Sequence, residues 1–299
     1  MTGLCGILPA IITPLDSAER FQPRAFECLL ERLYNAGVHG IYVCGQTGEG
    51  LLQSIEQRKA IAEVAVKWSP ADKKVIVHVG AYRTADAIEL ARHAARVGAH
   101  AVSSLPPLGG YSFAEVKAYY QALAELSDVP LLVYYFPELC STIASADQIL
   151  ELCSMTNVIG LKFTDFDLCR MSLVKDSGAV IFNDRDEVLV AGLLMGADGG
   201  IGTFYNLVPE LFLEIYNLTR EQRWEHARAV QMRINELIRL TLRFPMLPAV
   251  KTMLGWSGIA CGPCLAPRRA LTAAEEDQLR ELLDQFGFCR SSFLQPASA

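Results

Sequence analysis

The segment Asn157-Val158-Ile159-Gly160-Leu161-Lys162-Phe163-Thr164-Asp165 is a short apolar run that ends in polar residues, and it predicts a β-strand. Strand side chains alternate between the two faces of a sheet. One face is then expected to carry Val158, Gly160, Lys162 and Thr164, and the other Ile159, Leu161 and Phe163. The second face is wholly apolar, so we expect a helix to pack against it. The face with Lys162 must therefore look into a confined interior.

Lys162 is the most informative residue of this segment, because an ammonium group is poorly tolerated in such an interior. Burial favours the neutral amine and lowers its pKa. A lysine that is neutral part of the time is a nucleophile toward ketones, which is the starting point of Schiff-base chemistry. The alternative for a single strand lysine is a structural side chain that reaches solvent or forms an ion pair. The rest of the chain decides between the two.

Short β-rich segments alternate with amphipathic segments over most of the chain. Strands are predicted at residues 6–12, 38–44, 74–79, 100–105, 130–135, 158–163, 179–183 and 198–201. Helices are predicted between them at residues 23–36, 54–68, 84–97, 112–126, 145–155, 167–176, 186–196 and 207–218. Such strand–helix units predict an α/β fold, a (β/α)8 TIM barrel. The alternative, an open doubly wound sheet, usually has Gly-x-Gly-x-x-Gly after its first strand, and this sequence does not.

The strand pattern stops near residue 220. Residues 1–220 are therefore predicted to form the barrel with the active site. Residues 221–299 are predicted to form a C-terminal helical extension packed on the barrel, with helices at 221–243, 248–255 and 272–286. The tail from Arg290 to Ala299 is expected to be frayed.

Composition excludes several classes of function. The 27 basic and 33 acidic residues give a net charge of −6, which argues against nucleic acid as a partner. A hydrophobic content of 51% and a mean hydropathy of +0.23 suit parallel strands that are buried on both faces. There is no apolar run of about 18 or more residues and no charged-then-apolar leader, so we expect no membrane association and a cytoplasmic location.

The nine cysteines lie in apolar contexts and are odd in number, which favours buried thiols over a disulfide framework. Cys261-Gly262-Pro263-Cys264 matches a thioredoxin-type redox motif. That motif needs a strand before it and a helix that starts at the first cysteine. Here the flanking residues predict irregular loop, so a redox role is disfavoured. No second cysteine or histidine pair stands at zinc-ligand spacing, and no metal site is expected.

Active sites of such barrels lie at the C-terminal ends of the strands. The polar residues at these predicted ends are Gln46, Thr47, Glu49, Tyr134, Tyr135, Lys162, Thr164, Asp184 to Glu187 and Thr203. They place a lysine, tyrosines and hydroxyl groups on one rim. This convergence favours a catalytic Lys162 over a structural one.

Four motifs follow one another along the chain. They are Gly45-Gln46-Thr47-Gly48-Glu49, Val133-Tyr134-Tyr135-Phe136-Pro137, Gly160-Leu161-Lys162-Phe163-Thr164, and Gly196 to Thr203 followed by Tyr205-Asn206. Together they resemble the dihydrodipicolinate synthase/N-acetylneuraminate lyase family of class I, pyruvate-dependent aldolases. The resemblance runs in order from about residue 6 to residue 285.

The resemblance implies roles for individual residues. Lys162 is expected to condense with the ketone of pyruvate or of a 2-keto acid substrate, and the Tyr134 hydroxyl to shuttle the proton. The Thr47 hydroxyl and the backbone N–H groups of the Gly45–Gly48 turn are expected to hold the carboxylate. Gln46, Gly48, Thr164, Gly202 and Thr203 are the other expected substrate contacts. Singly, Thr47 is as well explained as a helix cap and Tyr134 as a strand aromatic; beside Lys162 they are not.

Within the family, the chain resembles the lyase branch. The synthase branch carries an arginine shortly after the proline of the tyrosine motif, and Glu138, Leu139, Cys140 and Ser141 supply none. Asp186 and Glu187 fall where lyases bind sugar hydroxyls, although acidic residues also suit an exposed helix start.

Three departures from the family pattern bear on substrate choice. Gln46 replaces the serine or threonine that relays protons to the tyrosine, and Pro106 to Gly110 lacks the usual aromatic pair. Asp184-Arg185 replaces a glycine and an aromatic residue, so Arg185 is expected to add a cation to the pocket.

The predicted function is cleavage of a 2-keto-3-deoxy sugar acid, such as N-acetylneuraminate, to pyruvate and an aldehyde. The alternatives are synthase-type condensation of pyruvate with an aldehyde, and a catalytically silent member that binds a keto acid. The resemblance implies a small-molecule 2-keto acid partner, a homotetramer, and no cofactor beyond the Schiff base on Lys162.

Overall fold

The computed structural model describes residues 3–288, and within them parallel strands form one barrel. The strands are β1 (Gly6–Pro9), β2 (Gly40–Val43), β3 (Lys74–His78), β4 (Ala101–Ser104), β5 (Leu131–Tyr135), β6 (Val158–Phe163), β7 (Val180–Asn183) and β8 (Gly199–Gly202). They follow the order β1-β8-β7-β6-β5-β4-β3-β2 with every pair parallel. A parallel bridge between Ala10 and Tyr42 joins the two end strands. The predicted (β/α)8 barrel is confirmed.

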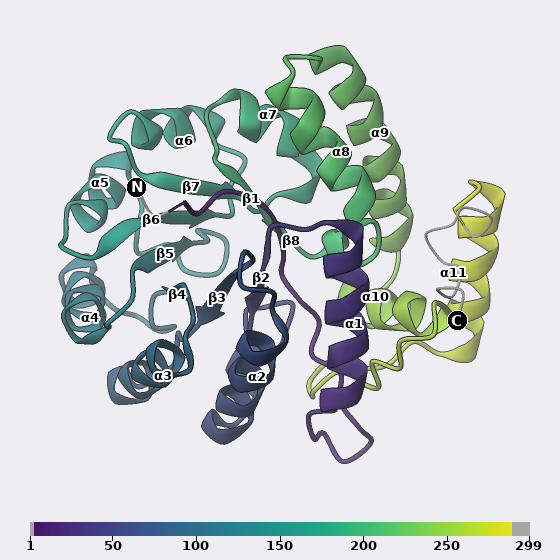
Figure 1. Ribbon diagram of the computed structural model, residues 1–299, viewed down its shortest axis with the longest axis horizontal. Helices are drawn as coiled ribbons and strands as arrows, with labels where there is room; N and C mark the ends of the chain where they lie inside the picture. Colours follow the sequence, from purple (N-terminus) through teal and green to yellow (C-terminus); the bar gives the residue numbers. More distant parts are fainter. Residues whose placement is uncertain (1–2, 289–299) are drawn as a thin grey trace.

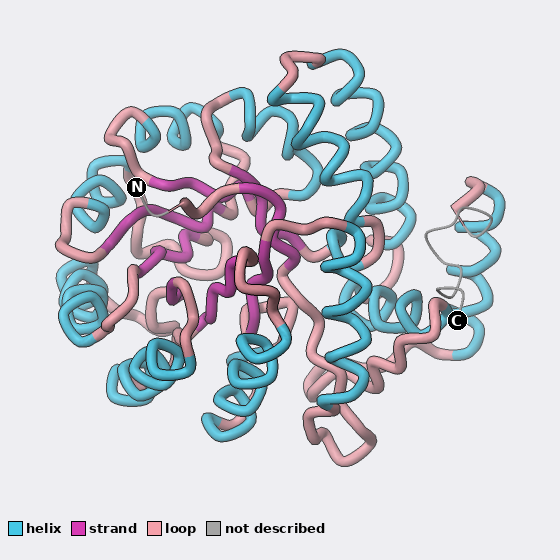
Figure 2. The backbone as a smooth tube through the Cα atoms, in the orientation of Figure 1, coloured by secondary structure: helices cyan, strands magenta, loops and turns pink. Residues whose placement is uncertain are grey.

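Helices surround the barrel on its outside (Figures 1 and 2). They are α1 (Pro23–Ala36), α2 (Ile55–Trp68), α3 (Thr84–Val97), α4 (Phe113–Leu126), α5 (Ala146–Cys153), α6 (Leu168–Lys175), α7 (Leu189–Leu194) and α8 (Pro209–Arg220). Three short 3-10 turns precede or follow them, η1 (Gly50–Leu52), η2 (Asp186–Val188) and η3 (Phe204–Asn206). The C-terminal helices are α9 (Trp224–Thr241), α10 (Met246–Trp256) and α11 (Ala273–Gln285).

The continuous helix predicted at residues 186–196 is wrong, because the segment is divided into η2 and α7. The cause is the side-chain amide of Gln231 in α9. Its Nε2 donates to the Asp186 carbonyl over 2.9 Å, and its Oε1 accepts from the Val190 N–H over 3.1 Å. In a continuous α-helix these two backbone groups bond to each other. The inserted amide replaces that bond and leaves Asp186 on a tight turn at the barrel mouth.

Two apolar cores hold the barrel. The larger lies between strands and helices, and the smaller fills the barrel interior, where it includes Leu8, Ile76, Leu132, Phe182 and Ile201. Alternation along each strand sends side chains to one core or the other. The site therefore sits on a packed interior plug rather than over an open channel.

The strand β6 departs from simple alternation at its start. Val158 packs in the outer core and Ile159 against the interior cluster, so the predicted faces of these two residues are wrong. The pairing register with β5 shifts here, since Leu131 is opposite Val158 but Leu132 is opposite Gly160. This extra residue exchanges the faces. From Gly160 onward the prediction holds, with Leu161 and Phe163 in the outer core and Lys162 in the interior.

The C-terminal helices are fastened to the barrel through a buried ion pair. The Lys251 Nζ of α10 lies 2.7 Å from Glu49 Oε2, and both side chains are almost inaccessible to solvent. The Leu265 N–H donates to Glu49 Oε1 over 2.8 Å, and the Arg268 guanidinium lies 3.7 Å from the same oxygen. Glu49 thus joins the loop after β2 to residues far along the chain. The division at residue 220 stays a prediction.

Two further expectations from the sequence concern the C-terminal tail and membrane-spanning helices. The tail from Arg290 to Ala299, together with Cys289, lies outside the described residues. No helix within residues 3–288 is both long and apolar enough to span a membrane.

Candidate active site

A cavity of about 590 Å³ opens at the carboxyl ends of the strands. Most residues predicted as the site line it, namely Gln46, Thr47, Tyr134, Thr164, Arg185, Asp186, Glu187 and Thr203. The other three lie directly behind this lining. Lys162 contacts the Tyr134 ring, Gly48 follows Thr47, and a Cβ atom on Gly202 would come within 1.7 Å of Asp186 Oδ1. The structure therefore brings the predicted set together.

Lys162 is buried at the base of this cavity. Its residue is 2% exposed, and its Nζ lies 3.8 Å from the centre of the Tyr134 ring and 5.4 Å from that of Tyr42. Burial lowers the pKa of Lys162 below its ordinary value, although the carboxylate of Asp184 opposes the shift. The environment thus increases the share of neutral, nucleophilic amine.

Asp184 also lines the cavity, although it was not among the predicted catalytic or substrate-binding residues. Its Oδ2 forms an ion pair with Lys162 Nζ and accepts a hydrogen bond from Thr164 Oγ1. The Tyr134 hydroxyl also lies 3.4 Å from this oxygen. The signal was available, because Asp184 follows β7 in alternation with Phe182, which packs in the barrel interior.

Tyr134 is held by aromatic and polar neighbours inside the barrel. Its ring stacks on Phe136 and meets the rings of Tyr42 and His78 edge to face. Burial raises the pKa of the Tyr134 hydroxyl well above its ordinary value, and the nearby Asp184 carboxylate adds to the shift. The hydroxyl therefore stays protonated in this structure and is available as a proton donor.

His78 packs against the Tyr134 ring, and both of its ring nitrogens have hydrogen-bond partners. Its Nδ1 lies 3.0 Å from the Cys44 carbonyl, and its Nε2 accepts from the Leu105 N–H over 3.1 Å. Burial and the nearby Arg58 guanidinium hold the pKa of His78 well below its usual value. A neutral imidazole that donates at one nitrogen and accepts at the other fits these partners. His78 therefore positions Tyr134 rather than acting as a base.

The turn after β2 combines a side-chain hydroxyl with backbone N–H groups beside the cavity. Thr47 Oγ1 lies 2.6 Å from Thr203 Oγ1, so hydroxyl groups from the segments after β2 and β8 meet there. The Gly48 carbonyl accepts from Thr13 Oγ1 and Gln53 Nε2, which fixes the turn. Among the described residues, none accepts a hydrogen bond from the N–H groups of Thr47 or Gly48. A carboxylate fits donors of this kind.

Asp186 and Glu187 also line the cavity. The Asp186 Oδ2 accepts from the Phe204 N–H over 2.8 Å, while Oδ1 is buried without a partner among the described residues. Burial raises the pKa of Asp186 well above its ordinary value. An unpartnered buried oxygen that lies against the cavity is well placed to accept a hydroxyl from a ligand.

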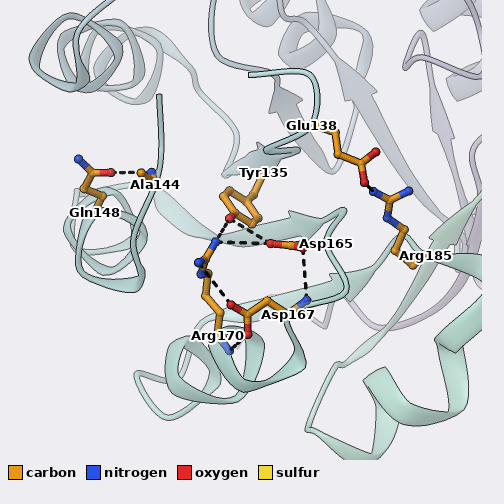
Figure 3. A network of polar contacts seen from close by, with 8 residues as sticks. All are labelled: Tyr135, Glu138, Ala144, Gln148, Asp165, Asp167, Arg170 and Arg185. Atoms are coloured by element: carbon orange, nitrogen blue, oxygen red, sulfur yellow. Dashed lines mark hydrogen bonds and ion pairs between the residues drawn. The ribbon is translucent and has the colours of Figure 1, made fainter. Parts of the chain in front are cut away.

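Arg185 lines the cavity, but its charge is already paired. Its Nη2 contacts Glu138 Oε1, as Figure 3 shows, and its guanidinium lies 4.5 Å from the centre of the Phe166 ring. Glu138 occupies the segment where the sequence analysis found no arginine. The predicted cation therefore lies at the cavity wall, but it is paired with Glu138. An anionic ligand must either displace Glu138 or bind beside the intact ion pair.

Two polar residues at strand ends belong to other environments. Tyr135 points to the helical side of β5, where its hydroxyl lies 3.2 Å from Asp165 Oδ2 and contacts the Arg170 guanidinium (Figure 3). Glu49 is directed away from the cavity into its ion pair with Lys251. Strand alternation turns Tyr135 away from the cavity, and the long-range ion pair turns Glu49 away from it.

The C-terminal extension contributes a wall of the cavity that the sequence analysis did not anticipate. This wall consists of Leu242, Pro245 directly before α10, the first residues of α10 at 246–248, Arg268 and Arg269. No local signal in the sequence marks these residues, since they reach the mouth only through packing of the extension on the barrel. The outer part of any ligand would meet them.

Cys261 and Cys264 lie in a loop after α10, as the flanking residues predict. Both are buried, and burial raises the pKa of Cys261 to about 12 and that of Cys264 to about 11. Reactive motifs of this type need a lowered thiol pKa. The described cysteines are all free thiols. The arrangement disfavours a redox role for this pair.

Comparison with known proteins agrees with this geometry. The Dihydrodipicolinate synthetase family model matches residues 3–286. The chain belongs to this family. The N-acetylneuraminate lyase of Rhizobium meliloti (strain 1021) is 34% identical over 279 residues, which cover 92% of this chain and 93% of that relative. The N-acetylneuraminate lyase of Escherichia coli (strain SMS-3-5 / SECEC) is 32% identical over 285 residues, with 94% and 95% covered.

Solved structures of the same family have the same fold. The wild-type sialic acid aldolase of Ruminococcus gnavus superposes with a TM-score of 0.91 at 27% identity, and 97% of this chain and 99% of that chain are covered. Family membership and these relatives make the chain a carbon–carbon lyase of the class I aldolases.

Proposed function

We propose that this enzyme cleaves a 2-keto-3-deoxy sugar acid, with N-acetylneuraminate as the nearest model, to pyruvate and an aldehyde. One observation carries the proposal: the buried amine of Lys162 lies 3.8 Å from the Tyr134 ring beneath a cavity. Carboxylate binding alone does not require a buried amine. The names of the relatives, N-acetylneuraminate lyase and sialic acid aldolase, favour a sugar acid as substrate.

The steps follow from the positions of the side chains. The substrate carboxylate binds the turn at Thr47 and Gly48, which places the adjacent ketone toward Lys162. The amine condenses with the ketone and releases water, so that the iminium becomes the electron sink. Loss of the C4 hydroxyl proton then breaks the C3–C4 bond, and the bond's electron pair forms the enamine. Tyr134 shuttles that proton on to the enamine carbon, and water then hydrolyses the resulting iminium to pyruvate and the free Lys162 amine.

The remaining lining residues suit a polyol chain. Asp186 Oδ1 and Glu187 accept hydroxyl groups, and the cavity volume of about 590 Å³ lies within the ordinary range for small-molecule sites. Since the iminium supplies the electron sink, neither a metal ion nor an organic cofactor is required in this scheme. Chelators are expected to leave the rate unchanged. The family resemblance also suggests a homotetramer, and light scattering would measure the mass of the assembly in solution.

The test is reductive trapping. Borohydride with pyruvate is expected to add a stable three-carbon adduct at Lys162, located by peptide mass spectrometry, and Lys162→Ala is expected to abolish it. A wild-type protein that stays unmodified would overturn the proposal and any other Schiff-base mechanism. Pyruvate release from N-acetylneuraminate and other 2-keto-3-deoxy acids then ranks the substrates.

The competing reaction is condensation of pyruvate with an aldehyde that carries a second carboxylate. Arg185 is the observation in its favour, because its guanidinium lines the cavity. Its pairing with Glu138 weighs against it. Aspartate semialdehyde with pyruvate is therefore expected to give no measurable condensation, and efficient condensation would reverse the assignment. Anion binding without any trapped adduct would instead indicate a silent keto-acid-binding member.

A further inference from the structure

The Asp184 carboxylate is at the centre of a three-way contact inside the barrel. Its Oδ2 meets Lys162 Nζ, Thr164 Oγ1 and the Tyr134 hydroxyl, which come from two neighbouring strands. The Asp184 side chain is 10% exposed, so water screens these contacts little. A single carboxylate oxygen thus touches both the amine and the hydroxyl that the proposed function uses.

We propose that Asp184 is a catalytic acid–base residue that exchanges protons with the Lys162 amine and with the Tyr134 hydroxyl. The inference rests on the proposed function and adds to it a group that replaces the missing hydroxyl relay. Gln46 stands where the family has a serine or threonine, and its amide hydrogen-bonds but does not readily transfer protons.

The proton balance of Schiff-base formation closes on this residue. Asp184 takes a proton from the Lys162 ammonium, which leaves a neutral amine and a carboxylic acid. The amine lone pair forms the C–N bond, the carbonyl π pair moves to oxygen, and a proton passes from nitrogen to that oxygen to give a neutral carbinolamine. The acid then protonates the hydroxyl, water leaves, and the iminium and the carboxylate are restored as a pair. Net charge is unchanged throughout.

The same carboxylate serves the carbon–carbon step through Tyr134. When Tyr134 gives its proton to the substrate or takes one from it, Asp184, whose Oδ2 lies 3.4 Å from the hydroxyl, compensates the change. The other titratable groups that face the pair are Tyr42, His78, Arg185, Asp186 and Tyr205. His78 has both nitrogens engaged and Arg185 is paired. Among the described residues, Asp184 is the carboxylate that contacts both Lys162 Nζ and the Tyr134 hydroxyl.

A matched control lies on the other face of the same strand. Tyr135 donates to Asp165 over 3.2 Å on the helical side of β5 (Figure 3). This contact matches that of Tyr134 with Asp184 inside the barrel. Asp165→Asn changes a tyrosine-bound carboxylate outside the cavity. It is expected to keep the wild-type rates.

The experiment measures two proton-dependent rates with pyruvate alone. Borohydride trapping reports formation of the Lys162 adduct, and exchange of the pyruvate methyl protons in D₂O, followed by NMR, reports proton transfer at the enamine. Asp184→Asn is expected to lower the maximal rate of both by roughly 100-fold or more, as for loss of a general acid–base group. Asp184→Gly is expected to behave likewise and to regain activity with added formate, a small carboxylate that fits the vacated space.

The pH profile separates catalysis from simple ion pairing. The Asp184 charge favours the Lys162 ammonium, so its removal lowers the pKa of Lys162 further. If Asp184 only pairs with the ammonium, Asp184→Asn shifts the acidic limb to lower pH and keeps the maximal rate. That result, or an absence of formate rescue in a folded Asp184→Gly, would overturn the inference while wild-type trapping upholds the proposed function. A wild type that forms no adduct would overturn both.

Discussion

Tyr134 and Lys162 occupy directly paired positions on the neighbouring strands β5 and β6, and the Lys162 Nζ lies 3.8 Å from the centre of the Tyr134 ring. The ring covers the amine and excludes water from it. Burial therefore lowers the pKa of Lys162 below the ordinary 10.5. Register between two parallel strands thus sets the protonation state of the proposed nucleophile.

This relationship predicts a pH dependence for adduct formation. The neutral amine is the nucleophile, so the rate of borohydride-trapped adduct formation with pyruvate rises with pH and levels off once Lys162 is deprotonated. Since its pKa is lowered, the plateau is expected below pH 10.5. The measurement is the initial trapping rate across pH at fixed pyruvate concentration. A rate that still rises with pH beyond the ordinary lysine pKa would contradict it.

A second prediction concerns the position of Gln46, which lines the cavity beside Thr47. Gln46→Ser introduces a hydroxyl that can both accept and donate a proton near Tyr134. The rate of N-acetylneuraminate cleavage is expected to rise roughly 10-fold if this hydroxyl adds a second proton relay beside Asp184. Steady-state kinetics with Gln46→Ala as control separates the hydroxyl from the loss of the amide. Equal rates in both variants would show that only side-chain size matters.

A third prediction concerns the ion pair of Arg185 with Glu138 at the cavity wall. Glu138→Gln releases the guanidinium, which can then bind a second carboxylate on the substrate. A hydrogen bond to a charged group contributes roughly 1.5–3 kcal/mol, so KM for a dicarboxylic 2-keto-3-deoxy acid is expected to fall about 10- to 100-fold.

The control for this pair is the double variant. Adding Arg185→Ala to Glu138→Gln is expected to cancel the gain, and monocarboxylic substrates are expected to respond little to either change. A gain that survives without Arg185 would assign the effect to another group on the wall, such as Arg268 or Arg269.

The sequence predicted the fold because the periodic patterns of its strands and helices agree with the barrel along the whole described chain. The predicted helix 23–36 matches α1 to the residue, and every predicted strand overlaps an observed one. The errors came from long-range contacts. The Gln231 amide that divides residues 186–196 belongs to a helix more than one element away, and no local pattern marks it.

The candidate site shows the same limit. Motif residues such as Lys162 and Thr47 were placed correctly because strand ends define the barrel mouth. Asp184 is among the strand-end residues, and alternation with Phe182 directs it inward, but its contact with Lys162 depends on the register of β6 and β7. The role of Arg185 was predicted without Glu138, because pairing across loops is not visible in sequence.

The last prediction concerns stability and the buried ion pair that joins the barrel to its C-terminal helices. Lys251→Met removes the ammonium and leaves the Glu49 carboxylate, whose side chain is 0% exposed, without its main counter-charge. Breaking a buried pair in this way is expected to lower the free energy of unfolding by about 3–5 kcal/mol. Urea denaturation measures this directly. The matched control is Arg268→Met. The Arg268 side chain is a third exposed and lies 3.7 Å from the same carboxylate. Its loss is therefore expected to lower the free energy of unfolding by about 1 kcal/mol or less. The double variant Glu49→Gln with Lys251→Met removes both charges and is expected to recover part of the stability. If Lys251→Met unfolds at the wild-type urea concentration, the pair does not fasten the extension to the barrel.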